Sequence, residues 1–569
     1  MENMYGSLQE QQAFLSAPQN QEIDTKTVYV QRPIQNNLQV IQKNEEQKKA
    51  EAEKSAQWFK TVAPGTILYA IVYAICMYKN PEGIGVPFGV GATLYFFYYY
   101  AKKFYGTARK CDMFLMITTV ILGILTCTTD SEPLIYLNKL MIFVLATIYL
   151  LSLFFDVSGW SFRAYVKAGW YAFWGGISMM LTPFAEGMAF LKIRKMKKEK
   201  ETMDEKAKEK MIAIIIGIII AIPIVFVLVL LLSGADLFFR EMAENIIDSI
   251  IYWELPEFFD RDFFGFLGTV LVAYMLGYGV VSYITTKDTI SKETARKGIK
   301  ANPYIAISCS VMIAFVYLVF VGIQIFGLFM GALTLPDGYT YAEYARQGFF
   351  QLAFVCFFNV CMVLIVMGCF EDNAALKWIM AVISACTYVM LVSAAYRMIL
   401  YISVYHLTFL RVFVLWAIAV MAITMVGITV FIFKKEFPIF KYMLVSITVL
   451  YIGFAAAHPD FWIAKYNIAQ AETKEGIDEY QLLFKLSLDA AVPVLDYYGE
   501  SIENPTGYYN EYLEKYCLTE SAARNRNYCL RIEEAQEEMN IRTFNFSKAV
   551  AGYKLKQYGI PEYDMNFTE

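Results

Sequence analysis

Long runs of apolar residues alternate with short polar segments along most of this chain, and the run "MIAIIIGIIIAIPIVFVLVLLL" at 211–232 is one example. About 20 consecutive apolar residues cross a bilayer core as a helix, because only a helix satisfies its own backbone in lipid. The pattern predicts an all-α, polytopic integral membrane helix bundle. About eleven transmembrane helices are expected, near 62–78, 84–100, 111–128, 134–155, 211–233, 263–285, 304–330, 348–370, 376–396, 412–433 and 438–457.

Two further segments have polar and apolar residues at helical spacing instead of a continuous apolar run. Segment 160–191 is rich in aromatic residues with scattered charge and contains Pro183, so we expect it to lie in the membrane interface. Segment 236–261 has acids on one face and Phe, Ile and Trp on the other. Both are predicted to be amphipathic and not to span the membrane.

The two ends of the chain are polar. Residues 1–60 are rich in Gln, Asn and Glu, which predicts a disordered tail that becomes helical near its end. Residues 458–569 are expected to form a small helical region. Within it, 476–499 has apolar residues at three- and four-residue spacing, which predicts one amphipathic helix. One or two further helices are expected after it, the last closed by Gly559 and Pro561.

The orientation follows from the lysines and arginines of the short loops. With the N-terminus inside, the cytoplasmic loops hold 24 of them and the opposite loops hold 7. Positive charge is retained on the cytoplasmic side, so the N-terminal tail (1–60) is predicted to be cytoplasmic. An odd number of spans then places 458–569 outside. That region has 19 acidic and 11 basic residues, a net charge of −8, which suits the outer face.

Composition agrees with a membrane protein and excludes some chemistry. The chain is 57% hydrophobic and 18% charged, whereas soluble proteins carry about 25% charged residues. It has ten cysteines without a C-x-x-C pair and only two histidines, so we expect no metal site and no cofactor. Cys517 and Cys529 are close enough in sequence for a disulfide on the outer side, although spacing alone does not show that the sulfurs meet.

A polar stripe enters the membrane at the outer end of the eighth expected span. Glu343 and Arg346 are one helical turn apart, and Gln351 and Asn359 continue the stripe into the apolar run. Buried polar groups at membrane depth are costly unless they face other helices or a cavity. The stripe therefore raises the hypothesis of an outward-facing binding site. The alternative is that Glu343 and Arg346 form an interfacial salt bridge that fixes helix depth and contributes little energy.

Arg397 and Arg411 are assigned to the same side, as are both histidines, His406 and His458. Together with Arg346, these arginines would favour an anionic headgroup, phosphate or carboxylate, since the guanidinium group binds such anions through two hydrogen bonds. The histidines could titrate near neutral pH. The alternative for all of these residues is anchoring at the interface and helix capping. Asp489 has no partner at a fixed spacing, so the sequence assigns it no catalytic role.

Seven stretches within 210–560 form a recognisable series: "LLSGADLFF", "GIQIFG", "YTYAEYARQGFFQL", "YRMILYISVYHLTFLRVFVLW", "HPDFWIAKYN", "LSLDAAVPVL" and "IRTFNFSKAVAGYKL". They resemble a family of bacterial polytopic membrane proteins, domain of unknown function 4173, which is related to 4153. His406 stands where this family is expected to have glycine, and His458 where it is expected to have asparagine. The resemblance implies a bacterial cell membrane protein and brings no activity, substrate or cofactor.

Three classes of function follow from these features. The first is transport or handling of a solute or lipid through the outward polar site. The second is an envelope sensor or regulatory membrane subunit, with a membrane or cytoplasmic protein partner engaged by the 1–60 tail and the basic segment 192–210. The third is a membrane-embedded transferase, for which Asp236, Glu343 and Asp460 are the candidate acids. Membrane lipids are expected partners and nucleic acid is not.

Overall fold

The computed structural model describes residues 26–106, 113–157, 159–198, 261–286, 289–290, 300–326, 341–471, 478–503, 507–510 and 515–558, with single residues between 217 and 242. The chain divides into two compact units. One comprises residues 1–63 with 182–240, and the other comprises 64–181 with 241–569. Helix α2 (Lys26–Met77) begins in the first unit and ends in the second.

In the first unit, α2 packs against α7 (Thr182–Lys198). The rings of Phe59 and Phe190 lie 5.7 Å apart. Gly187 leaves room for Phe59, since a Cβ at this position would meet the ring at 3.2 Å. The part of α2 near Phe59 therefore packs against α7. The sequence predicts that both of these segments are cytoplasmic.

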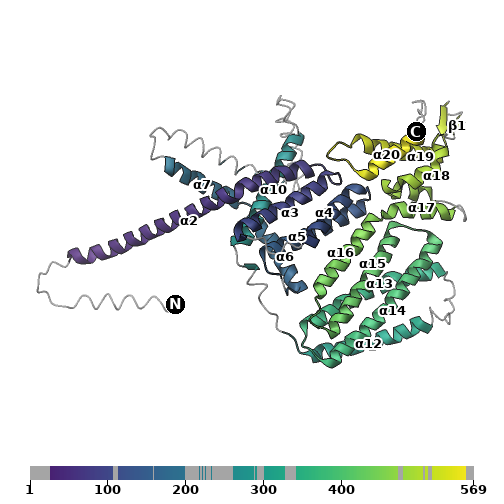
Figure 1. Ribbon diagram of the computed structural model, residues 1–569, viewed down its shortest axis with the longest axis horizontal. Coiled ribbons are helices and arrows are strands. Elements are labelled where there is room, and N and C mark those ends of the chain that lie inside the picture. Colours follow the sequence, from purple (N-terminus) through teal and green to yellow (C-terminus); the bar gives the residue numbers. More distant parts are fainter. Residues whose placement is uncertain are drawn as a thin grey trace. The chain divides into compact units, whose positions relative to one another are not determined.

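The second unit contains two groups of long helices (Figure 1). The first group is built from α3 (Gly85–Tyr105), α4 (Met113–Thr128), α5 (Glu132–Phe154), α6 (Phe162–Ser178) and α10 (Arg261–Thr286). The second group is built from α12 (Pro303–Gln324), α13 (Tyr341–Cys369), α14 (Ala374–Tyr405), α15 (Phe409–Phe433) and α16 (Ile439–Ala456).

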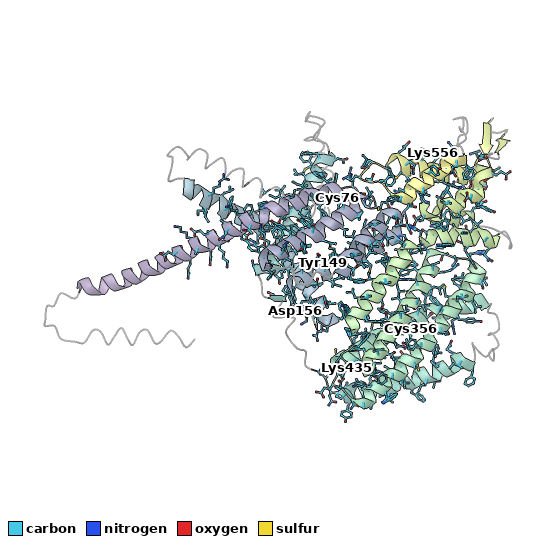
Figure 2. All side chains as sticks on the ribbon, viewed as in Figure 1. Cys76, Tyr149, Asp156, Cys356, Lys435 and Lys556 are labelled. Carbon is cyan, nitrogen blue, oxygen red and sulfur yellow. The ribbon has the colours of Figure 1, made fainter. Side chains whose placement is uncertain are left out.

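The second group has a continuous apolar core in which Cys356, labelled in Figure 2, is fully buried. Helix α16 joins the two groups. Its Tyr451 hydroxyl donates to Asn138 on α5 at 2.7 Å, and Phe440 stacks on Tyr165 of α6 with ring centroids 4.3 Å apart. The two groups are therefore packed parts of one unit.

Within the described residues, eight helices are long and apolar enough to cross a membrane. They coincide with eight of the expected spans, so the multi-pass helical architecture is confirmed. Expected spans 84–100 and 111–128 are helices α3 and α4, of which α4 is apolar but only 16 residues long. Expected span 211–233 and most of the amphipathic segment 236–261 lie outside the described residues.

Segment 160–191 forms two helices, α6 and α7, that are separated at Met179–Leu181. Helix α6 presents a stripe of exposed apolar residues at helical spacing: Phe162, Val166, Trp170, Phe173 and Trp174. Its opposite face buries small residues, and Gly175 and Gly176 let α10 approach through Tyr283 and Val280. The segment is helical, and its expected position in the membrane interface stays a prediction.

The C-terminal region, residues 459–558, packs around its own apolar core. Its elements are α17 (Pro459–Ala471), the π-helical turn η3 (Gln481–Lys485), the 3-10 turn η4 (Leu488–Ala490), α18 (Ala491–Glu503), β1 (Gly507–Asn510), β2 (Lys515–Leu518), α19 (Glu520–Glu537) and α20 (Phe546–Tyr558). Strands β1 and β2 pair antiparallel, with Tyr508 opposite Cys517. The sequence predicted helices alone, so this short hairpin is an addition to the expected architecture.

The predicted single helix over 476–499 is wrong. The backbone is extended at Leu486 and Ser487, with ψ of 152° and 173°. These extended residues turn backbone N–H groups of 487 and 488 toward Asp460 and Asp130. The apolar spacing is helical, but hydrogen bonds to distant carboxylates replace the helical ladder at this point.

Candidate functional site

The expected outward stripe is only partly described. The side chains of Glu343 and Arg346 lie outside the described residues, although both residues belong to α13. Gln351 is exposed on the outside of the helix group. Asn359, by contrast, is fully buried. Gln351 and Asn359 therefore do not line a common polar surface.

Asn359 forms a hydrogen-bonded link between three helices. Its Oδ1 accepts from the Tyr317 hydroxyl of α12 at 2.7 Å. Its Nδ2 donates to Thr387 of α14 at 3.0 Å. These partners occupy the side chain and give it a packing role at membrane depth.

We expect Asn359→Leu to destabilise the helix group only modestly. Hydrogen bonds between membrane helices contribute about 0.6 kcal/mol each on average, because polar groups also find partners in the unfolded state within the membrane. The predicted loss is therefore about 1 kcal/mol for two bonds. Unfolding measured in bicelles against the wild type checks this value, and a loss above about 3 kcal/mol would contradict a purely structural role.

Arg397 lies deeper in the bundle than the sequence indicated. It is 6% exposed, and its guanidinium donates to Gln324 Oε1 at 3.1 Å. The hydroxyl of Ser393 donates to the same oxygen at 2.7 Å. Helix α13 passes directly over this group at Gly348, where a Cβ would lie 2.4 Å from the arginine Nη1. The cation is thus enclosed between α12, α13 and α14.

Arg411 does not join Arg397. Its guanidinium donates to the carbonyl oxygens of Tyr405 and His406 and lies 4.4 Å from the centre of the Tyr401 ring. These carbonyls belong to the end of α14, where a cation offsets the negative end of the helix dipole. Arg411 therefore caps a helix, which is the alternative that the sequence had left open.

Both histidines have backbone conformations that disfavour ordinary side chains. His406 has φ of 61° and His458 has φ of 47°. Positive φ is adopted most readily by glycine, and asparagine tolerates it better than most residues. This explains the glycine and asparagine that the resemblance leads us to expect at these positions.

We expect His406→Gly to stabilise the protein by about 1 kcal/mol, because glycine removes the strain of positive φ at the end of α14. Thermal unfolding of the purified protein in detergent checks the sign of the change. His406→Ala is the matched control, since it removes the imidazole and keeps the Cβ. Equal stability of the two variants would contradict the strain argument.

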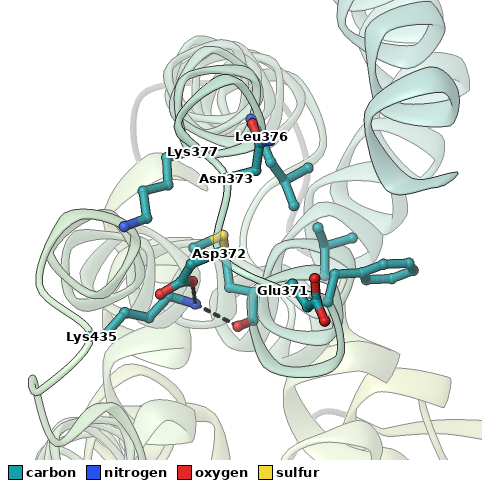
Figure 3. A pocket seen from close by; sticks show the side chains of 9 residues that line it. Glu371, Asp372, Asn373, Leu376, Lys377 and Lys435 are labelled. Atoms are coloured by element: carbon teal, nitrogen blue, oxygen red, sulfur yellow. Dashed lines mark hydrogen bonds and ion pairs between the residues drawn. The ribbon is translucent and has the colours of Figure 1, made fainter. Parts of the chain in front are cut away.

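A hollow lined by Met367, Phe370, Asp372, Lys377 and Lys435, with their neighbours, lies where α13 ends and α14 begins. Figure 3 shows Lys435 between Asp372, at 3.2 Å, and the carbonyl of Met367, at 2.6 Å. The hollow has a volume of about 160 Å³, which includes open solvent, whereas ligand pockets measure about 300–1,000 Å³. Lys435 thus neutralises the end of α13, and the hollow is too small for a typical ligand.

A dense polar group among the described residues of the second unit surrounds Asp489, whose side chain is 1% exposed. Its two oxygens accept from the Thr129 hydroxyl at 2.6 Å, the Asp130 N–H at 2.7 Å and the Ser547 hydroxyl at 2.6 Å. His458 Nδ1 lies 3.0 Å away. One carboxylate therefore ties the loop between α4 and α5 to three parts of the C-terminal region.

A second set of contacts joins the C-terminal region to the loop between α2 and α3. The N–H groups of Ile84 and Gly85 donate to the carbonyls of Phe544 and Arg542 at 2.9 and 3.0 Å. Gly83 lies against Thr543, because a Cβ on Gly83 would be 2.4 Å from the Thr543 Cα. Asn545 Nδ2 contacts both loops, because it donates to the Glu82 carbonyl at 3.3 Å and to the Thr129 carbonyl, between α4 and α5, at 2.9 Å.

We call these contacts the junction: loops 78–86 and 129–131 on one side, and residues 458–460, 487–489 and 540–548 on the other. Four charged groups complete it: Lys548, Glu82, Asp130 and, from α19, Arg531. Lys548 pairs with Glu82 at 2.5 Å. Asp130 accepts from the N–H of Leu488 at 2.9 Å, and the Arg531 guanidinium lies 3.7 Å from the Asp130 carboxylate.

Burial and hydrogen bonding shift the acidities of the junction in opposite directions. Burial raises the pKa of Asp130 to about 6, although the N–H of Leu488 and the charge of Lys548 act in the opposite direction and lower it. Burial also raises the pKa of Asp460. At Asp489 the hydrogen bonds from His458, Ser547 and Thr129 outweigh burial and lower the pKa. The same bond to Asp489 raises the pKa of His458.

Sequence reasoning missed Asp489 because its partners are 31 to 360 residues away. The transferase candidate Asp460 is 4% exposed and accepts from Ser487, which leaves it no access to a substrate. Asp236 lies outside the described residues. Among the residues that the structure describes, no group of three or more His, Cys, Asp or Glu is placed to hold a metal ion.

The expected disulfide does not agree with the structure at one of its two cysteines. Cys529 is a free thiol that is 3% exposed in the C-terminal core. The side chain of Cys517 lies outside the described residues. The sequence spacing is compatible with a bond, but the Cys529 side chain packs in the apolar interior of the C-terminal region as a free thiol.

Comparison with known proteins gives a family without an assigned activity. No curated protein and no solved structure matches the chain. The model of DUF4153, a domain of unknown function, matches residues 116–497. It is this family, and not the related 4173, that is shown. The match extends from α4 to α18 and includes Asp130, Asp460 and Asp489 of the junction. Because it covers well over half of the chain, this multi-pass membrane protein belongs to the DUF4153 family.

Proposed function

We propose that the protein is an envelope sensor or regulatory membrane subunit. Its C-terminal region, outside the cell, would transmit a change to the membrane helices through the junction, and the N-terminal tail would engage a protein partner. The observation that carries this proposal is the Asp489 carboxylate, which joins the C-terminal region to the loop between α4 and α5. Such a fixed link converts movement of one part into movement of the other.

The intramembrane polar groups support this choice over transport. Asn359 bonds to Tyr317 and Thr387, and Gln324 bonds to Ser393 and Arg397. These bonds hold helices together. A transporter instead needs polar groups that bind its substrate near the bilayer centre.

A second candidate is handling of an anionic solute or lipid through the expected outward site, and the burial of Arg397 favours it. A buried arginine at membrane depth is a functional candidate by default, because it is costly to place there. We expect Arg397→Ala to abolish uptake or transfer if this candidate is right. Arg411→Ala, which removes a helix cap, is the control and would leave uptake within about twofold.

The sensor proposal is tested by photo-crosslinking in intact bacteria. A photoreactive residue at Lys48, which is exposed on α2, would capture a partner of the tail. We expect one discrete protein adduct in the wild type. The yield of this adduct should change at least threefold in Asp489→Ala, because this substitution disconnects the C-terminal region. In Asp496→Ala, an exposed ion-pair variant on α18, the yield should match the wild type.

Two results would contradict the proposal. One is the absence of any protein adduct from position 48, with lipid as the sole crosslinked species. The other is an adduct whose yield is the same in the wild type and in Asp489→Ala, provided that both proteins are inserted at equal levels. In the second case the tail would bind a partner independently of the C-terminal region.

A further inference from the structure

We propose that the junction is a proton-controlled latch, which holds the C-terminal region most tightly in mild acid and loosens as the pH rises through neutrality. This inference rests on the proposed sensor function and names its stimulus.

The junction buries more negative than positive charge. Four carboxylates meet there, those of Glu82, Asp130, Asp460 and Asp489. None of them is more than 18% exposed. The cations paired with them are Lys548 and Arg531, and Lys139 also faces Glu82. The carboxylates therefore outnumber the permanent cations unless protons bind, and buried uncompensated charge is strongly unfavourable.

His458 is placed to take one proton. Its Nδ1 lies 3.0 Å from the buried carboxylate of Asp489, while its side chain remains 32% exposed and can exchange protons with solvent. Asp460 is the other charge that faces this imidazole. Protonation of His458 thus converts a bond between a neutral imidazole and a carboxylate into an ion pair at the centre of the junction.

Asp460 is placed to take another proton. Its Oδ2 accepts from the N–H and the hydroxyl of Ser487, at 3.3 and 2.6 Å. Its Oδ1 is buried beside the Ser131 hydroxyl, and neither atom has a hydrogen bond of normal length among the described residues. Burial and the neighbouring Asp489 charge favour a proton on this carboxyl, and they outweigh Ser487 and Ser131, which lower its pKa.

The acidities agree in sign. Burial raises the pKa of Asp130 from 3.8 to about 6, so the stability that this group gives the junction is lost as the pH rises between these values. The hydrogen bond to Asp489 raises the pKa of His458 above 6.5, so its contribution is lost as the pH rises beyond 6.5. Asp489 acts oppositely, but only below 3.8, since its pKa is lowered.

The remaining charged groups do not reverse this sign. Lys548 faces Glu82, Asp130 and Glu538, and these acids keep its pKa above the usual value despite burial. It therefore stays protonated throughout the range of interest. Lys139 faces Glu82 from α5, and Arg542 lies near Cys76 and donates to the carbonyl of Ile75.

Amide hydrogen exchange of the full chain in nanodiscs at pH 5.0 and 8.0 tests the latch. The reporters are the N–H groups of Ile84, Asp130 and Leu488, which bond across the junction. After correction for intrinsic exchange, we expect their protection factors to be at least tenfold lower at pH 8.0. Equal protection at the two pH values in the wild type would overturn the inference.

Variants assign the effect to the junction. Asp130→Asn combined with Asp460→Asn imitates the protonated carboxyls, so the pH dependence should fall below threefold. Should this variant not fold, His458→Asn still tests the idea, since it should abolish the change in protection between pH 6.5 and 8.0. Asp496→Asn, outside the junction, should keep the full pH dependence. Unchanged pH dependence in the junction variants would refute the assignment. Exchange is measured without a partner, so failure of the latch is distinguishable from failure of the sensor proposal.

Discussion

Asp489→Ala is expected to cause the largest loss of stability of any single substitution at the junction, about 3–5 kcal/mol. The substitution removes the acceptor of three hydrogen bonds and the partner of His458 in a site that is 1% exposed. The Thr129 and Ser547 hydroxyls and the Asp130 N–H are then left buried without this acceptor. Unsatisfied buried donors cost about 1–3 kcal/mol each.

The labelling rate of the Cys529 thiol measures this loss under native conditions. Cys529 is buried in the C-terminal core, and burial raises the pKa of its thiol to about 12, so it reacts only when the region opens. We expect labelling to accelerate roughly hundredfold or more in Asp489→Ala, since each 1.4 kcal/mol corresponds to about tenfold. Asp496→Ala is the matched control, because exposed ion pairs contribute about 0–1 kcal/mol. An acceleration below about tenfold would show that Asp489 does not anchor the region.

Gly83→Ala is expected to have the second largest effect, a weakening of the junction by about 1–3 kcal/mol. A Cβ on Gly83 would lie 2.4 Å from both the Thr543 Cα and the Asn80 Oδ1. Backbone on the other side must then move away, which lengthens the neighbouring bonds from Ile84 and Gly85 to the C-terminal region. Faster amide exchange at Ile84 and Gly85 is the measured outcome.

Gly91→Ala is the matched control for Gly83→Ala. Gly91 lies in α3, and a Cβ at this position meets nothing within 4 Å. Because alanine is favoured over glycine in a helix by about 1 kcal/mol, Gly91→Ala should stabilise the protein or leave it unchanged. Similar destabilisation by both substitutions would indicate a general intolerance of alanine, and would contradict a specific contact between Gly83 and Thr543.

The membrane architecture could be predicted from sequence because its cause is local. A run of apolar residues long enough to span the bilayer, such as 412–433, forms a helix wherever it lies, and the structure has α15 there. The one or two helices expected after 476–499 are a second local signal, and the structure has α19 and α20 there, whereas Gly559 and Pro561 lie outside the described residues. In each case the physical reason lies within one segment.

The junction could not be predicted because its cause is not local. Asp489 is one acid in the middle of an apolar stretch, and its partners Thr129, His458 and Ser547 are distant in the chain. The same distant bonds interrupt the expected helix over 476–499. The prediction that Gln351 and Asn359 share one polar surface was wrong because it used spacing along a single helix. Such spacing does not show which face of the helix its neighbours cover.

The central claim is that the C-terminal region and the two loops open as one unit. Amide exchange at Ile84 and Gly85 in Asp489→Ala tests it most directly, because these amides bond to Phe544 and Arg542 and not to Asp489. We expect their exchange to accelerate by the same factor as Cys529 labelling, roughly hundredfold. Exchange at the wild-type rate, with Cys529 labelling accelerated, would show that the C-terminal region unfolds without releasing the loop, and would contradict the coupling.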